Sequence, residues 1–409
     1  MKYAFAKACI TPKLGSRLAG FNRTIPVQGV LDDLYLQVLL LEDDSKQQSI
    51  IISGEIIGFE SSFVKKIRQY VVKKYPNIKA SAICFNATHT HGGPATVYFV
   101  DAIGAYDSAY VKFLEKTLKN LLEEVLKAKA KKASIFGGKG NCNLSVNRRL
   151  PTGMGVNEKG STDKNVSLIA IKSKDEEILL INYACHPTIM QSSFISGDYP
   201  SSAIRALKAQ SKLKREIIFL QGAGADLKPR CFSEDGKKFR YGNSFDVATI
   251  ADMLVKAVNK IVSNKMNTIK LNLNSSHCQI RLDYNTDEKL KLPFLKGGKK
   301  IFNQRRKENS FSGVVVELQY WRLSKNCKLV SLSGEICHQI GLNAKKILKC
   351  DLPLFLGYSN GLPGYIPTDT IIKEGGYEGH TSMQYYGHPH PIQLGAEKKI
   401  YDALKKLLN

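Results

Sequence analysis

Four short polar segments carry the residue types that bind metal ions or move protons. One places His89 and His91 two positions apart, and the others contain His186, Asp226 and Glu335. In an extended loop, residues two apart point to the same side, so both imidazoles can face one ion; alternatively, one ring binds the ion and the other supports it. Any one of these residues alone is as typical of a hydrogen-bonded structural group. Three of the eight histidines lie in such segments, which favours a metal site.

Other catalytic motifs are absent or incomplete. The chain has no H-E-x-x-H and no G-x-x-x-x-G-K-[ST] motif, and the glycines within 222–226 lack the G-x-G-x-x-G spacing. One G-x-S-x-G match contains Ser359, but the helix-breaking residues Leu362-Pro363-Gly364 follow, where a serine-hydrolase elbow requires a helix. We therefore expect neither a zincin, nor a phosphate-binding loop, nor a nucleophilic Ser359.

The spacing of apolar residues predicts strands and helices in alternation. Short runs rich in apolar and β-branched residues predict strands at 34–41, 49–53, 80–86, 178–184, 216–221, 330–332 and 354–357. Apolar residues three or four positions apart predict amphipathic helices at 60–74, 110–132, 201–212, 245–265, 339–348 and 392–408. This order indicates an α/β fold whose sheet is covered on both sides.

The candidate ligands come directly after predicted strands. Loops at strand ends are where α/β enzymes assemble their sites, so we expect these loops to meet. A further loop, 358–377, is rich in Gly and Tyr. The stretch 268–321 interrupts the alternation with an alternating strand at 269–273 and a Lys- and Gly-rich insertion at 292–309. We interpret it as an appended subregion of one domain that spans 1–409.

The chain is strongly basic, with 60 Lys and Arg against 36 Asp and Glu and a formal charge of +24. The basic residues are dispersed, and no zinc finger, RNP motif or arginine-rich arm accompanies them. We therefore expect no nucleic-acid partner. A field of this sign attracts anionic substrates or lipid head groups, so transient contact with a membrane surface is compatible with it.

The sequence favours a cytoplasmic protein. No apolar run is long enough for a transmembrane segment, and charged residues interrupt the first positions where a signal peptide is apolar. The nine cysteines are scattered and form no C-x-x-C pair, which is typical of reduced, buried thiols.

Seven segments resemble, in order, the catalytic domain of the neutral/alkaline, non-lysosomal ceramidases. They are Ile10-Thr11-Pro12 with Gly20-Phe21; the segment 87–94; Asn147-Arg148; the segment 182–188; the segment 196–199; the segment 221–226 with Pro229; and Gly334-Glu335 followed by the segment 364–368 and Tyr377-Glu378. The resemblance covers nearly the whole chain. It implies a mixed β-sheet core covered by helices, in a single large domain of the neutral ceramidase catalytic type.

The resemblance also implies a site. A zinc ion (Zn2+) would be held by His89, His186, Glu335 and Tyr365, with His91, Arg148 and Tyr377 around the scissile amide. N and O ligands with one open position suit a catalytic zinc, which lowers the pKa of its water to about 7. His91 would then move a proton to the leaving amine, while Arg148 and Tyr377 would donate hydrogen bonds to the oxyanion.

The function implied is that of a zinc-dependent amidohydrolase that cleaves a small N-acyl or lipid-like (ceramide-like) amide by attack of a metal-bound water. The alternative is a zinc hydrolase of the same fold acting on a non-ceramide ester or a sugar-linked amide. Two departures bear on this choice. Lys228 stands where the family carries a serine, so no serine nucleophile can act from that position. The chain also ends after its last predicted helix, and we expect the C-terminal sandwich domain of the family to be absent.

Overall fold

Three mixed β-sheets surround a central apolar core in the computed structural model, which describes residues 1–151, 153–290, 297–308 and 312–409. The N-terminal sheet has the order β5 (Ile83–Ala87), β4 (Gln48–Gly54), β3 (Tyr35–Glu42), β1 (Lys2–Cys9), β6 (Lys131–Lys132). The middle sheet has the order β13 (Lys214–Gln221), β11 (Glu176–Tyr183), β10 (Asn165–Lys172), β7 (Ser134–Asn141), β15 (Asn267–Thr268). The C-terminal sheet has the order β16 (Asn274–Asp283), β17 (Gly313–Arg322), β18 (Cys327–Leu332), β20 (Leu352–Leu356).

Each sheet contains one parallel pair of strands, namely β4 with β5, β11 with β13, and β18 with β20. Smaller ladders lie nearer the strand ends. They are β2 (Gly29–Val30) with β12 (Phe194–Ile195); β14 (Leu227–Pro229) with β8 (Ser145–Leu150) and β9 (Gly153–Asn157); and β19 (Glu335–Ile336) with β21 (Tyr365–Ile366).

Strand β3 shows why these runs are apolar throughout. Successive side chains of a strand point to opposite faces of its sheet. Leu36, Val38 and Leu40 face the helices outside the sheet. Leu39 and Leu41 face the central core, where all three sheets contribute side chains. A strand buried on both faces therefore reads as one continuous hydrophobic run.

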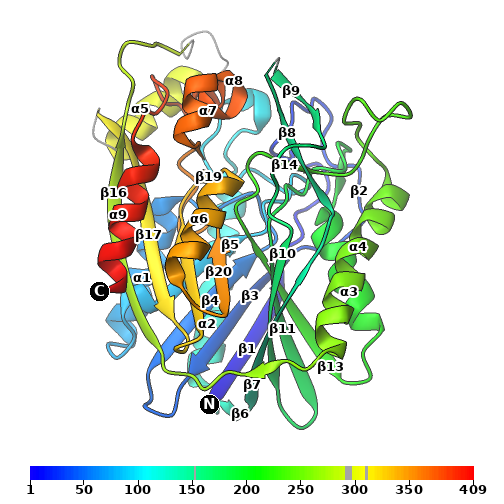
Figure 1. The fold of residues 1–409 in the computed structure, drawn as a ribbon, viewed down its shortest axis with the longest axis vertical. Helices are drawn as coiled ribbons and strands as arrows, with labels where there is room; N and C mark the ends of the chain where they lie inside the picture. The colour runs from blue at the N-terminus through cyan, green and yellow to red at the C-terminus, as the bar shows by residue number, and fades with distance from the viewer. Residues whose placement is uncertain (152, 291–296, 309–311) are drawn as a thin grey trace.

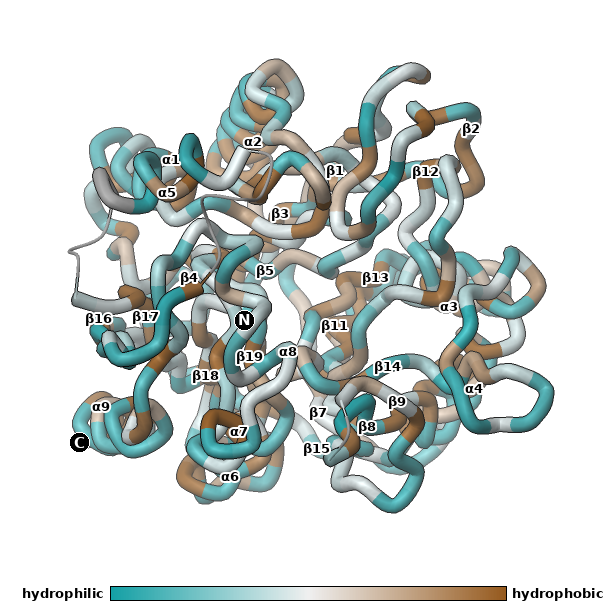
Figure 2. The backbone as a smooth tube through the Cα atoms, turned by 90° about the horizontal axis from the view of Figure 1, so that it is seen from above, coloured by the Kyte–Doolittle hydropathy of each residue, from teal (hydrophilic) through white to brown (hydrophobic). Residues whose placement is uncertain are grey.

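A pair of helices covers the outer face of each sheet. Figure 2, seen from above, shows the three pairs on three sides of the molecule. They are α1 (Ser61–Lys74) and α2 (Ser108–Lys127) on the N-terminal sheet, α3 (Asp198–Ala209) and α4 (Ser244–Ser263) on the middle sheet, and α6 (His338–Leu348) and α9 (Ala396–Leu408) on the C-terminal sheet. Shorter helices, α5 (Gly298–Glu308), α7 (Asp369–Glu374) and α8 (Gly376–Gly379), lie at one end of the sheets (Figure 1).

The α/β fold with a mixed-sheet core covered by helices is thus confirmed, as one domain. Every strand and helix position named above from the sequence overlaps an element of the same type, except 269–273; the strand predicted at 80–86 begins only at Ile83, after a 3-10 turn at Ala80–Ala82. Helix ends differ: the helix predicted at 110–132 ends at Lys127, and the one predicted at 392–408 begins at Ala396. None of the helices in the described ranges is both long and apolar enough to cross a membrane.

The segment 269–273 is extended but is not a strand. Its alternating residues Ile269, Leu271 and Leu273 are buried in the central core. Its backbone N–H groups bond to separate partners, the carbonyls of Ile135 and Leu323 and the side chain of Asp43. The prediction of a strand was wrong because the alternation records burial, whereas a strand also requires one continuous neighbour.

The stretch 268–321 is more closely integrated than an appended subregion. Strands β16 and β17 pair along their whole length, and β17 continues the ladder to β18. These strands therefore belong to the core sheet. Within the predicted insertion at 292–309, residues 292–296 and 309 lie outside the described residues, and α5 follows Gly297.

Candidate metal centre

The loops with the candidate ligands meet because three parallel strand pairs end at the same place. Asn86, at the end of β5, joins their ends. Its side-chain oxygen Oδ1 accepts a hydrogen bond from the backbone N–H of Gln221 at 2.8 Å. Its side-chain nitrogen Nδ2 donates to the backbone carbonyl of Gly357 at 2.8 Å. One buried side chain therefore links the ends of β5, β13 and β20, one strand from each sheet.

Three imidazoles gather at this junction. One nitrogen from each of His89, His91 and His186 lies within 4.8 Å of the other two, a group that can hold a metal ion. The Nε2 atoms of His89 and His91 are 3.3 Å apart. All three rings are buried, and His91 is the most exposed at 9%. The backbone of His89 has φ of 64°, the left-handed region that a non-glycine residue rarely adopts.

The remaining ring nitrogens distinguish two of these histidines from the third. Nδ1 of His89 donates to the carbonyl of Ile57 at 2.6 Å, and Nδ1 of His186 donates to that of Gly224 at 2.8 Å. These bonds fix the tautomer with the Nε2 lone pair directed into the cluster, the arrangement of metal-binding histidines. Nδ1 of His91 is buried and has no hydrogen-bond partner within the described chain.

Glu335 adds a carboxylate to the imidazoles. Its Oε2 lies 3.4 Å from Nε2 of His89 and 3.1 Å from Nε2 of His186. Its Oε1 accepts a hydrogen bond from the hydroxyl of Tyr386. Burial acts to raise the pKa of Glu335, but the adjacent imidazoles outweigh it and hold the pKa well below its usual value.

This donor set fits a divalent cation. Both Nε2 atoms lack a hydrogen on their inward side, and Oε2 of Glu335 has no hydrogen-bond donor in the described residues. A buried carboxylate oxygen without a donor is costly unless a cation faces it. Burial also lowers the pKa of His186 to about 4, so the ring is neutral and free to bind a metal at neutral pH.

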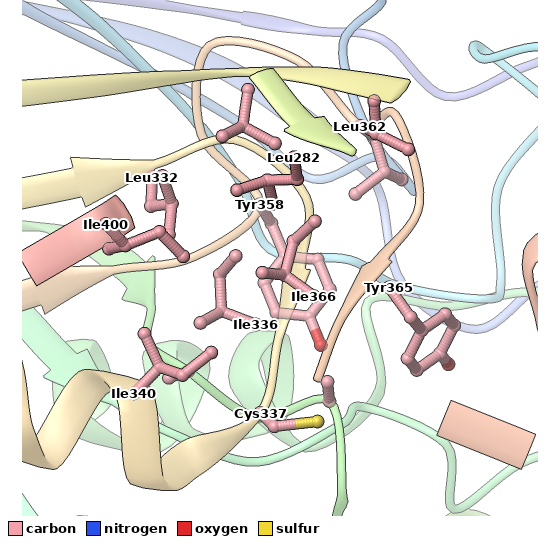
Figure 3. Packing of buried hydrophobic residues seen from close by; sticks show 14 of the residues in the cluster. Leu282, Leu332, Ile336, Cys337, Ile340, Tyr358, Leu362, Tyr365, Ile366 and Ile400 are labelled. Carbon is pink, nitrogen blue, oxygen red and sulfur yellow. The ribbon is translucent and has the colours of Figure 1, made fainter. Parts of the chain in front are cut away.

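Tyr365 is placed beside Glu335 by the β19–β21 ladder. The two residues are directly paired in this parallel ladder. The next pair, Ile336 and Ile366, turns into the apolar core, whereas Tyr365 points to the other side of its strand (Figure 3). The Tyr365 hydroxyl accepts a hydrogen bond of 3.1 Å from a terminal nitrogen of Arg148. Burial and the negative charge of Glu335 raise the pKa of Tyr365 well above its usual value.

Arg148 and Tyr377 lie against this tyrosine. Nε of Arg148 donates to Glu378 at 2.7 Å, and the rings of Tyr365 and Tyr377 are 5.3 Å apart at a steep angle. The guanidinium stands 5.5 Å from the Tyr377 ring. Burial acts to lower the pKa of Arg148, but Tyr365 and Glu378 hold it well above its usual value. A permanently charged donor thus lies beside the rings of both tyrosines.

Two other sequence candidates have different environments. Asp226 accepts the backbone N–H of His338 at 2.8 Å and its Nδ1–H at 2.7 Å, so both carboxylate oxygens are engaged at the start of α6. Ser359 is buried, and its hydroxyl donates to the carbonyl of Gly357 and accepts from Asn86. Neither residue is arranged as a ligand or nucleophile.

The residues that sequence reasoning missed are those that support the site. Tyr386 binds Glu335, and Asn86 joins the three sheets. Tyr386 belongs to a Tyr-rich segment, which is the only signal that could have indicated it. Asn86 is a polar residue at the end of an apolar run, a signal that many strands share.

Comparison with known proteins shows the fold. The chain matches no protein-family model and no curated protein. Among solved structures, a ceramidase in complex with C2 is similar with a TM-score of 0.78 and 14% identity, covering 99% of this chain and 74% of that one. The neutral ceramidase from Pseudomonas aeruginosa is similar with a TM-score of 0.76 and 15% identity over the same shares. At these identities the likeness establishes the neutral ceramidase catalytic fold.

Proposed function

We propose that the protein is a zinc-dependent amidohydrolase that cleaves a small N-acyl or lipid-like amide. One observation carries the proposal: the unpartnered oxygen of Glu335 faces the Nε2 atoms of both His89 and His186. The similarity of the fold to ceramidases adds support for an amide as the bond cleaved.

The metal would be held by His89, His186, Glu335 and Tyr365. This set of nitrogen and oxygen ligands suits zinc. A zinc ion bound there lowers the pKa of water and polarises a carbonyl oxygen. Arg148 would keep the hydroxyl of Tyr365 in place through their 3.1 Å hydrogen bond.

His91 would carry the proton. It lies in the cluster, but its Nδ1 lacks the carbonyl partner that fixes the other two rings. A neutral imidazole can take a proton at one nitrogen and pass it to the leaving amine. Burial, with the neighbouring imidazoles, holds the pKa of His91 well below its usual value, so the ring is neutral before the reaction and releases an acquired proton easily.

Arg148 and Tyr377 would stabilise the carbonyl oxygen as it becomes negative. Hydrogen-bond donors fixed in advance are effective here because they need no reorganisation during the reaction. Glu378 holds the guanidinium of Arg148 at Nε, and one terminal nitrogen donates to the hydroxyl of Tyr365.

The test is the release of fatty acid from N-acyl substrates by the zinc-loaded protein. We expect hydrolysis of an N-acyl amide, its loss after treatment with a chelator, and its recovery when zinc is restored. Hydrolysis of acyl esters without hydrolysis of amides would support the alternative zinc hydrolase. A metal-free protein that retains full activity would contradict the proposal.

A further inference from the structure

A run of aromatic rings leads from the histidine cluster to the surface. The ring of Phe21 lies 4.7 Å from that of His91, and the ring of Tyr241 meets Phe21 edge-on at 5.4 Å. Gly20, with φ of 88°, lets this loop approach closely, because a Cβ there would lie 2.1 Å from Nδ1 of His91. Tyr241 is 50% exposed. The run therefore joins the candidate proton carrier to solvent.

Two positively charged side chains make cation–π contacts with aromatic rings of this region. The guanidinium of Arg23 lies 4.8 Å from the centre of Phe21. The ammonium of Lys228 lies between two rings, 5.1 Å from the centre of Phe239 and 5.3 Å from that of Tyr241. Aromatic faces hold cations by their negative charge density, but they do not neutralise them.

Neither cation has a carboxylate in an ion pair within the described part of the chain. Arg23 donates to the carbonyl of Ala19, and its Nε is buried without a partner. The carboxylate whose charge acts on Lys228 is that of Asp198, but it forms no ion pair with the lysine. Its oxygens already accept three backbone N–H groups. Burial lowers the pKa of Arg23 to about 10 and that of Lys228 to about 8.

Several other partly or fully buried cations among the described residues are paired. Three of them in the described residues have a carboxylate within 3 Å, namely Arg68 with Glu317, Arg215 with Glu177, and Lys345 with Asp163. Buried basic side chains are rarely left without such a partner. Two unpaired cations on one run of rings therefore require an explanation.

We propose that Arg23 and Lys228 bind an anionic group of the substrate, a carboxylate, sulfonate or phosphate. This inference rests on the proposed function, and it narrows the substrate class from neutral ceramide-like amides to anionic N-acyl compounds. The anion would supply the negative charge that the protein lacks there. The aromatic rings beside the cations would contact the apolar part of the same molecule.

The test compares two amides that differ only in charge, N-dodecanoylglycine and neutral N-dodecanoylglycinamide. We expect the wild-type protein to show a higher kcat/KM for the anionic substrate. In Lys228→Met, which keeps the aliphatic stem, the ratio of the two kcat/KM values should fall about 10- to 100-fold, mainly through KM for the anionic substrate. Arg23→Gln should lower the same ratio.

The matched control is Lys260→Met, which removes one positive charge from an exposed position in the last turn of α4. It should leave the ratio unchanged, because this lysine is remote from the rings. A wild-type ratio near one, or an equal loss for both substrates in Lys228→Met, would overturn the inference while the proposed hydrolase stands.

A second measurement separates this inference from the proposed function. If neither amide is hydrolysed, the proposed function fails, and binding of N-dodecanoyltaurine is then measured by calorimetry. Tight binding to the wild-type protein and about 10-fold weaker binding to Lys228→Met would still support the anion site. Equal binding to both proteins would refute it. Comparing the glycine and taurine compounds also distinguishes a carboxylate from a sulfonate as the preferred group.

Discussion

At the scale of single residues, what separates a ligand from a proton carrier is the partner of the second ring nitrogen. His89 and His186 each donate Nδ1–H to a backbone carbonyl, and His91 does not. A ring held by such a bond presents its other nitrogen in a fixed direction, which a metal requires. A ring without it can accept or release a proton at Nδ1.

The metal set leads to the first prediction. Replacing His186 by Ala removes one ligand of four and should lower zinc affinity by at least about 100-fold, since even supporting residues contribute 10- to 100-fold. Metal analysis after dialysis should find about one zinc per chain in the wild-type protein and little in the variant. The control is His277→Ala, which changes an exposed histidine of β16. Equal zinc in His186→Ala and wild type would contradict the ligand set.

The donors for the oxyanion give the second prediction. Tyr377→Phe removes one hydroxyl while keeping the ring against Tyr365, so kcat should fall by about 10²- to 10³-fold with zinc content unchanged. Arg148→Lys should also lower kcat, because a lysine cannot contact Glu378 and Tyr365 together in the way that the guanidinium does. Wild-type kcat in both variants would remove these residues from the mechanism.

At the scale of elements, the site depends on how strand ends are joined. Asn86→Ala would leave the buried N–H of Gln221 and the carbonyl of Gly357 without this partner. We expect the free energy of unfolding to fall by about 2–3 kcal/mol. Urea unfolding measures it, with Asn77→Ala as the control in an exposed loop after α1. An effect no larger than that of the control would show that the junction is held mainly by other contacts.

Helix α6 is anchored by a second buried contact, that of His338 with Asp226. Burial acts to lower the pKa of His338, but Asp226 outweighs it and raises the pKa above 6.5. A raised pKa means that the charged ring stabilises the fold below the unfolded value and that this stabilisation is lost as pH rises through the folded value.

This linkage gives the pH prediction. The difference in the free energy of unfolding between wild type and His338→Asn should be steady below about pH 6.5 and should shrink above it. Chemical unfolding at about pH 5.5 and about pH 8.5, at equal zinc, measures that difference. Apart from Asp226, whose pKa depends on the His338 ring, the other titrating groups are common to both proteins and cancel. A difference that grows with pH would mean that the ring is neutral in the folded protein.

The elements also show what the sequence could predict. Strands such as β3 are long apolar runs, and local pattern alone reveals them. Strand β7 was not predicted, because Gly138 and Gly140 weaken its pattern; a Cβ at either would lie within 2.8 Å of Ile261, so the glycines make room for α4. The histidines and Glu335 are indicated by residue type, whereas Asn86 and Tyr386 act through contacts that only the fold creates.

At the scale of the whole molecule, the three-sheet arrangement explains where the site lies. The parallel pairs β4–β5, β11–β13 and β18–β20 each bring a loop to the same end, and the side chains of Asn86 and Asn182 tie those ends together. No local sequence pattern specifies this convergence, because an apolar run indicates that a strand is buried and not which strands of the other sheets it lies beside. The opposite ends of the strands carry none of the residues proposed to bind zinc.

The net charge of +24 yields the last prediction, at the same scale. A positive field raises the rate at which anions reach the site, and added salt screens it over about 10 Å at 0.1 M. For N-dodecanoylglycine, kcat/KM should therefore fall about 10-fold between about 20 mM and about 500 mM NaCl. For the neutral glycinamide, it should change less than about twofold.

Because the two substrates share acyl chain and amide, an equal loss for both would assign the salt effect to the enzyme rather than to steering. Lys228→Met should retain part of the salt dependence for the anionic substrate, since the long-range field comes from the many dispersed lysines, whereas Lys228 acts at contact distance.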